Sequence, residues 1–178
     1  GIVVQRSGFG LTEWGLYFAL TAGTLVLAWR DQANYRFLPW ISLVLSLTLL
    51  SVAPEATNFA AVTVVFAATF AVASLLFMWK ARDPVEWARL ACASAIAYFL
   101  LAFIRLNELV VIAKVMVGGL PLWGIIAMAM ATAFTLVTAR ALQRFGSTPK
   151  TQELLAYLAA TAVAFAALAL LFARTRGE

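Results

Sequence analysis

The chain has 178 residues, of which 64% are hydrophobic and only 12% are charged, and its mean hydropathy is +0.94. A typical soluble domain is about 45–50% apolar and about 25% charged, so this composition excludes an ordinary water-soluble protein and requires lipid as part of the solvent. One cysteine and no histidine exclude an intramolecular disulfide, histidine-ligated metals and catalysis by Ser-His or Cys-His pairs.

The apolar segments of the chain are predicted to be membrane-spanning helices. Backbone amides find no water in a bilayer, so spanning segments are helices or closed barrels, and barrel strands alternate polar with apolar residues. Residues 59–79 are apolar on every face, which argues against a barrel. Since a helix needs about 20 apolar residues to cross, we predict an all-α, six-transmembrane-helix bundle that forms one integral membrane domain, residues 1–178. The six predicted spans cover residues 11–29, 37–53, 59–79, 86–104, 121–142 and 154–173.

Polar segments separate these predicted spans. The first and third spans end at residues 30–36 and 80–84, and the last two spans are separated by residues 143–150. Pro39 falls in the first turn of the second span, where its missing amide proton costs no helical hydrogen bond. The segment between the fourth and fifth spans, residues 105–118, is less regular and mixes polar with apolar residues.

The lysines and arginines of the predicted loops indicate an orientation. The loops after the first, third and fifth spans carry eight of the 13 basic residues: Arg30, Arg36, Lys80, Arg82, Arg89, Arg140, Arg144 and Lys150. The opposite side carries five: Arg6, Arg105, Lys114, Arg174 and Arg176. Because cytoplasmic loops are enriched in Lys and Arg, eight against five predicts that both termini lie outside the cytoplasm. This distribution also accounts for the net charge of +5, so we expect no nucleic-acid partner.

Small residues recur every four positions in three of the spans, and we expect them to pack against neighbouring helices. Small-xxx-small patterns let helix backbones approach closely in lipid. The patterns are Gly15, Ala19 and Gly23 in the first span, Ala127 with Ala131 and Ala129 with Ala133 in the fifth, and Ala156, Ala160 and Ala164 in the sixth.

The two halves of the chain share a weak internal similarity. A Glu-Trp pair opens both the first and the fourth span, at residues 13–14 and 86–87. A Leu-Pro pair stands at the start of both the second and the fifth, at residues 38–39 and 120–121. Three spans per half is an odd number, so a true repeat would be inverted across the membrane, as in many transporters. The pattern is consistent with a 3+3 inverted repeat.

The candidate ligand-binding residues are Arg105, Asn107, Glu108 and Lys114. Ionisable groups at membrane depth are costly and tend to be functional, so these side chains are candidates for lining a polar cavity. The alternative is that residues 105–118 form an interfacial connector between the fourth and fifth spans, and the sequence leaves both interpretations open. No cofactor and no metal site is predicted.

Two functional hypotheses follow. In the first, the protein binds or transports a small solute or a lipid in a cavity between two three-helix halves, in the plasma membrane. In the second, it is a non-catalytic subunit or assembly factor of a larger membrane complex. Self-association into a homo-oligomer is compatible with both. An enzyme is a third and less favoured interpretation, because no pair of carboxylates shares one helical face and no nucleophile motif is present.

Overall fold

The structure is a computed structural model that describes residues 11–52, 59–109, 116–117, 120–146 and 148–174. Each of the six predicted spans overlaps one helix of at least 15 residues. These helices are α1 (Leu11–Arg30), α3 (Leu38–Val52), α4 (Phe59–Met78), α5 (Pro84–Leu109), α6 (Leu122–Phe145) and α7 (Pro149–Arg174). A single-turn helix, α2 (Gln32–Tyr35), follows α1, and a two-residue antiparallel ladder, β1 (Met116–Val117) with β2 (Leu120–Pro121), precedes α6.

Four of the helices, α4 to α7, are long and apolar enough to cross a membrane, as judged from length and composition. These four helices confirm the prediction of a helical protein with membrane-spanning segments. Helix α3 is apolar but has only 15 residues, and α1 is not among the candidate spans. The predicted count of six crossings is therefore supported for four helices.

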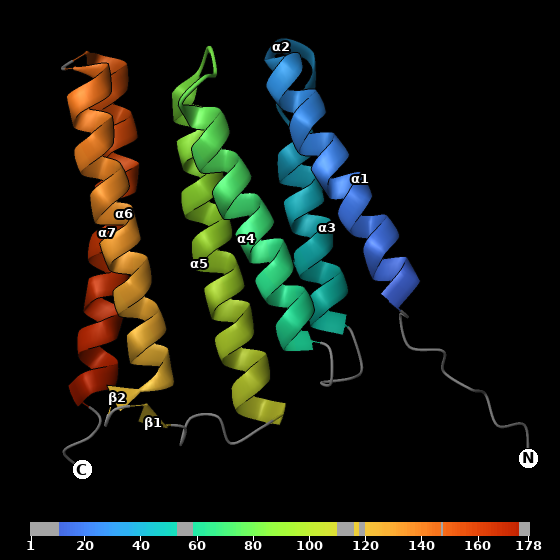
Figure 1. Ribbon diagram of the computed structural model, residues 1–178, viewed down its shortest axis with the longest axis vertical. Helices are drawn as coiled ribbons and strands as arrows, with labels where there is room; N and C mark the ends of the chain where they lie inside the picture. The colour runs from blue at the N-terminus through green and yellow to red at the C-terminus, as the bar shows by residue number, and fades with distance from the viewer. Residues whose placement is uncertain (1–10, 53–58, 110–115, 118–119, 147, 175–178) are drawn as a thin grey trace, which may run out of the picture.

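The long helices run alternately up and down (Figure 1), so that successive connections lie at opposite ends of the bundle. The end of α1, helix α2, the α4–α5 connection and the α6–α7 connection lie together at the top of the view, and we call this the basic end. The start of α1, the end of α7 and the β ladder lie at the other end. Of the basic residues that the structure describes, eight belong to the basic end and only Arg105 and Arg174 to the opposite one.

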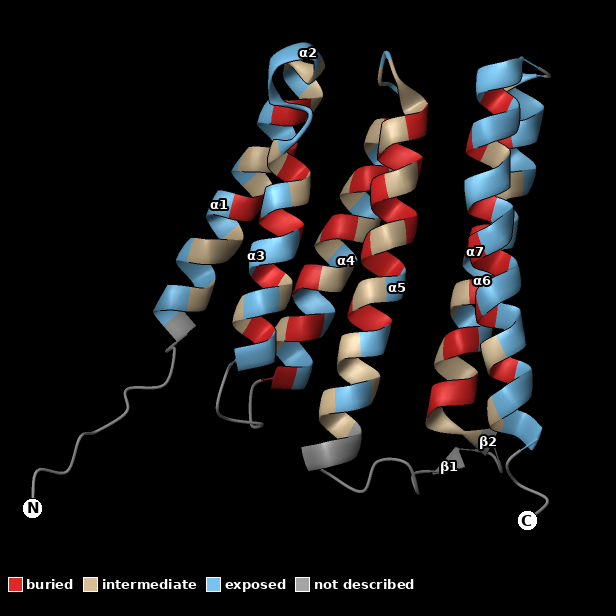
Figure 2. Ribbon diagram, turned by 180° about the vertical axis from the view of Figure 1, so that it is seen from behind, coloured by how far each residue is buried: buried red, intermediate tan, exposed pale blue. Residues whose placement is uncertain are grey.

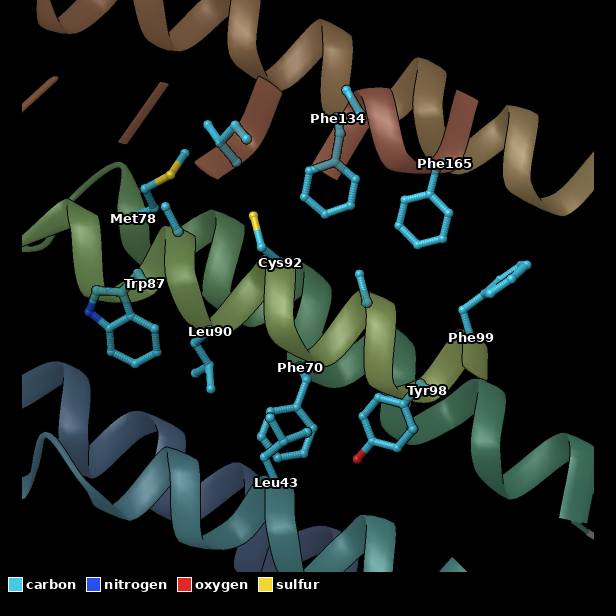
Figure 3. Packing of buried hydrophobic residues seen from close by; sticks show 14 of the residues in the cluster. Leu43, Phe70, Met78, Trp87, Leu90, Cys92, Tyr98, Phe99, Phe134 and Phe165 are labelled. Atoms are coloured by element: carbon cyan, nitrogen blue, oxygen red, sulfur yellow. The ribbon is translucent and has the colours of Figure 1, made fainter. Parts of the chain in front are cut away.

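Helix α5 is the central element of the bundle. Half of its apolar window is buried, compared with 22% of that of α6. Figure 3 shows that Leu90 and Tyr98 point from α5 toward the N-terminal helices, whereas Cys92 points toward the pair formed by α6 and α7. Figure 2 shows the same helix with buried residues along much of its length. The two sides of the molecule are thus joined through α5.

Aromatic side chains fill the space on both sides of α5. Toward the N-terminal helices, the rings of Phe70 and Tyr98 lie 5.9 Å apart. Toward the C-terminal pair, Phe99 contacts Phe165 edge to face at 5.3 Å, and Phe165 stacks on Phe134 at 6.2 Å. Ring pairs at 4.5–7 Å contribute beyond their buried area, so these contacts hold α6 and α7 against α5.

Hydroxyl groups connect the N-terminal helices to one another and to α5. The Tyr98 hydroxyl on α5 lies 2.5 Å from Ser46 Oγ on α3, and both residues are buried. The Tyr17 hydroxyl on α1 donates to the Ser42 carbonyl oxygen, and Ser42 Oγ donates to Thr21 Oγ1. Such bonds hold helices together in lipid, where the hydrophobic effect does not.

The small-residue patterns pack as predicted at only one pair, Ala127 with Ala131, whereas the second pair of the same helix, Ala129 with Ala133, is exposed. In α6, Ala127 and Ala131 are buried, and a Cβ on the nearby Gly124 would lie 3.3 Å from Phe172 Cβ of α7. The prediction is wrong for α1, where Gly15 and Gly23 are exposed and a Cβ added at either would meet no described atom within 4 Å. It is also wrong for α7, because the three alanines of its pattern are exposed: Ala156, Ala160 and Ala164. Spacing identifies a small-residue face but not the direction in which that face points.

Candidate functional site

Of the four predicted site residues, the structure places the side chain of Arg105 alone. It is half-buried near the end of α5, and its guanidinium carbon lies 5.9 Å from the ring centre of Phe59 at the start of α4. Asn107 and Glu108 belong to the last turn of α5, but their side chains lie outside what is described. Lys114 lies outside the described residues altogether. A polar site formed by these four residues stays a prediction.

A groove runs along the bundle between α3, α5 and α7, and we call it the interhelical groove. Its volume is about 520 Å³. Helix α5 contributes Arg89, Cys92, Ala93 and Ile96, helix α7 contributes Tyr157, Ala160, Thr161 and Ala164, and α3 contributes Trp40. It therefore lies between a helix of the N-terminal half and two helices of the C-terminal half.

Two polar groups in the wall of the interhelical groove bond to the backbone of α7. The Thr161 hydroxyl donates to the Tyr157 carbonyl oxygen at 2.9 Å, and Cys92 Sγ approaches the same oxygen at 3.5 Å. The hollow itself results from Ala93, Ala160 and Ala164, since larger side chains at these positions would fill it. The groove presents methyl groups and aromatic surface to whatever occupies it.

A charged cluster forms the polar end of the interhelical groove. Arg89 donates from Nη1 to Glu86 at 2.7 Å, within α5, and from Nη2 to Glu153 on α7. Its guanidinium carbon lies 5.1 Å from the ring centre of Tyr157. Two carboxylates surround one guanidinium, so the cluster ties α5 to α7 and carries a formal net charge of −1. The apolar wall of the interhelical groove ends at this cluster.

A second hollow lies at the basic end, between the α1–α2 corner and the α4–α5 connection, and we call it the basic groove. Its volume is about 760 Å³. Its charged lining residues are Arg30, Asp31 and Arg36 on one side and Lys80, Arg82, Asp83 and Glu86 on the other. The Gln32 amide links the two sides, because Nε2 donates to the Asp83 carbonyl oxygen at 3.0 Å and Oε1 accepts from the Asp83 amide at 3.2 Å.

The two grooves meet at a small hollow of about 20 Å³. This hollow shares Gln32, Arg36 and Glu86 with the basic groove, and it shares Trp40 with the interhelical groove. Its volume suits a single water molecule. Trp87, which also lines it, is 3% exposed, and its Nε1 has no hydrogen-bond partner among the described residues. The residues that line this hollow thus border both grooves, which lie next to each other on the bundle.

Sequence reasoning missed the residues of these grooves. The spacing of Glu86 and Arg89 indicates their ion pair, since i,i+3 partners of opposite charge pair on a helix. The second ion pair of Arg89, with Glu153 64 positions further on, could not be predicted because it depends on how α7 docks on α5. In the part of the chain that the structure describes, no cluster of three or more acidic or cysteine side chains is suited to a metal ion.

No known protein family, curated protein or solved structure matches the chain.

Proposed function

We propose that the protein is an integral membrane protein that binds a lipid, with an acyl chain lying in the interhelical groove. The observation that carries this proposal is an apolar groove of about 520 Å³ between the two halves of the chain, bounded at one end by the Glu86–Arg89–Glu153 cluster. An amphiphile has the same division into an apolar and a polar part. Wall residues such as Ile96 and Ala164 are exposed, so in a bilayer they contact hydrocarbon.

Six membrane crossings are part of this proposal. Helix α1 has 20 residues and is about 30 Å long at 1.5 Å per residue, which matches the hydrocarbon core. Helix α3, with 15 residues, is about 22 Å long, so its crossing requires local thinning of the bilayer. The proposed location is the plasma membrane, with the basic end on the cytoplasmic side. The 3+3 inverted repeat also stays a prediction. The helices of the first half are shorter than those of the second, so helix length does not support it.

A second candidate function, a non-catalytic subunit of a larger membrane complex, is favoured by the outer face of α1. Gly15, Ala19 and Gly23 lie on this face, all three are exposed, and a Cβ added at either glycine would meet no described atom within 4 Å. Faces of this kind support close helix contacts in lipid. A stoichiometric foreign polypeptide in the purified protein would favour this function over lipid binding.

The lipid proposal is tested by filling the groove. The full chain, wild type and Ala160→Phe, is purified gently from its own membrane, and bound lipid is measured by native mass spectrometry. The matched control is Ala133→Phe, an equally large change at an exposed position of α6 outside the groove. We expect Ala160→Phe to weaken lipid retention about tenfold, equivalent to about 1.4 kcal/mol, and Ala133→Phe to leave it unchanged. Equal retention by all three proteins would overturn the proposal.

A further inference from the structure

We propose that the basic groove binds the phosphate of an anionic phospholipid whose acyl chain lies in the interhelical groove. This inference rests on the proposed lipid-binding function and assigns the class of lipid. The starting observation is that the two grooves lie next to each other on the bundle, since the small hollow is lined by Glu86 of the basic groove and by Trp40 of the interhelical groove. We infer that one amphiphile lies across the outside of this hollow and reaches both.

The charge of the basic groove fits an anion. Four cations line it, two from the α1–α2 corner and two from the α4–α5 connection: Arg30, Arg36, Lys80 and Arg82. Among the described residues, the salt bridges within 4 Å are those of Arg89, so none of these four cations is paired with a carboxylate. The groove therefore has basic groups available for a ligand.

Two of the three acidic residues that line the basic groove are already engaged. The Asp31 carboxylate accepts a hydrogen bond from Asn34 Nδ2 at 2.7 Å and caps α2. The Glu86 carboxylate accepts from Arg89 at 2.7 Å. With four cations against three carboxylates, the formal charge of the lining is +1, which favours an anion over a cation.

The two basic sides are held at a fixed separation by the paired hydrogen bonds between Gln32 and the backbone of Asp83. Cations from two separate chain segments thus face a common space without needing to be brought together by the ligand. Guanidinium groups present a planar fork of donors that matches phosphate oxygens. Preorganisation of this kind lowers the entropic cost of binding.

The setting of the basic groove favours a lipid phosphate over a soluble one. Trp29 lines the groove and stacks on Phe77 with ring centres 5.1 Å apart. Tryptophan is enriched at the headgroup level of a bilayer, so the groove lies where lipid phosphates lie. The cytoplasmic leaflet, which the basic end faces in the proposed orientation, is the one rich in anionic lipids.

The test uses the delipidated full-length protein and native mass spectrometry with ligands of matched acyl chains. Phosphatidylglycerol, phosphatidylcholine and diacylglycerol are titrated separately, and inorganic phosphate is titrated alone. We expect phosphatidylglycerol to bind about tenfold more tightly than phosphatidylcholine or diacylglycerol, since basic residues near the membrane surface attract an anionic headgroup. Raising the salt concentration should reduce this preference.

The variants locate the preference. The double substitution Arg36→Gln and Arg82→Gln should abolish the preference for phosphatidylglycerol and leave diacylglycerol binding unchanged. The matched control is Arg140→Gln with Lys150→Gln, which removes the same charge from the basic end but outside the groove. We expect the control to keep the full preference, and equal losses in both double variants would overturn the inference.

The remaining outcomes separate the inference from the proposed function. Binding of all three lipids with equal affinity would overturn the headgroup assignment and leave the acyl-chain groove intact. Binding of none of them would overturn both. Tight binding of inorganic phosphate that is lost in Arg36→Gln with Arg82→Gln, without any lipid preference, would assign the groove to a soluble anion and overturn the inference.

Discussion

At the scale of single residues, the buried hydroxyl of Tyr98 shows how polar groups stabilise this bundle. It meets Ser46 Oγ at a distance of 2.5 Å and thereby joins α5 to α3. Tyr98 also packs on Phe70, so its ring and its hydroxyl contribute separately. The contribution of the hydroxyl is therefore accessible to substitution without loss of the ring.

Tyr98→Phe and Ser46→Ala should each destabilise the protein, with a coupling of about 0.6 kcal/mol and at most about 1.7 kcal/mol, the range measured for interhelical hydrogen bonds in membranes. The measurement is a double-mutant cycle on reversible unfolding in mixed micelles. Ser51→Ala is the control, because the exposed Ser51 hydroxyl bonds only to Thr48 within its own helix. Additive effects of the two substitutions would contradict the bond.

Two arginines differ in how far their roles could be predicted from the sequence. The cost of ionisable groups in lipid drew attention to Arg105, which lies near the end of a candidate span. The sequence pattern groups Arg89 with the loop residues that indicate orientation, whereas the structure shows that it bridges two helices at the end of the interhelical groove. Its role depends on Glu153 and Tyr157, and sequence separation hides both partners.

At the scale of helices, the contact of α6 with α7 depends on the absence of a side chain at Gly124. A Cβ there would lie 3.3 Å from Phe172 Cβ, 3.5 Å from Pro121 Cγ and 3.8 Å from the Ala169 carbonyl oxygen. Little room is left for branched side chains between these helices.

Gly124→Val should destabilise the protein by about 1–3 kcal/mol, because overpacking forces the α6–α7 pair apart. The same mixed-micelle unfolding measurement reports the change. Gly15→Val is the matched control on α1, where no described atom lies within 4 Å of the added Cβ. A loss at Gly15 as large as that at Gly124 would place the close helix contact elsewhere.

The helices were predictable because apolar length in the sequence is set by the thickness of the bilayer. The ends were less predictable, since hydropathy measures transfer into lipid rather than helix formation. Helix α5 continues to Leu109, beyond the predicted limit of residue 104, because polar residues continue a helix readily. Helix α7 begins at Pro149 rather than residue 154, since Thr148 Oγ1 accepts from the Thr151 amide and proline suits a first helical position.

At the scale of the whole molecule, the grooves arise from the way α7 rests against α5. The exposed alanine face of α7 turns toward the space beside α5 and α3, where Ala160 and Ala164 leave a hollow instead of a close helix contact. The alanine pattern predicts either result equally well, so the hollow could not be derived from the sequence. The polarity of the two ends, in contrast, follows from the positions of the basic residues along the chain.

The proposed occupant of the interhelical groove is a lipid acyl chain. The most direct measurement is photo-cross-linking of the reconstituted full chain with phosphatidylglycerol that carries a diazirine midway along one acyl chain, followed by peptide mapping. We predict that label concentrates on residues 92–96 of α5 and 157–164 of α7 and falls in Ala160→Phe. Label spread evenly over other exposed apolar positions, such as Leu16 and Leu20 on α1 and Leu136 on α6, would contradict the claim.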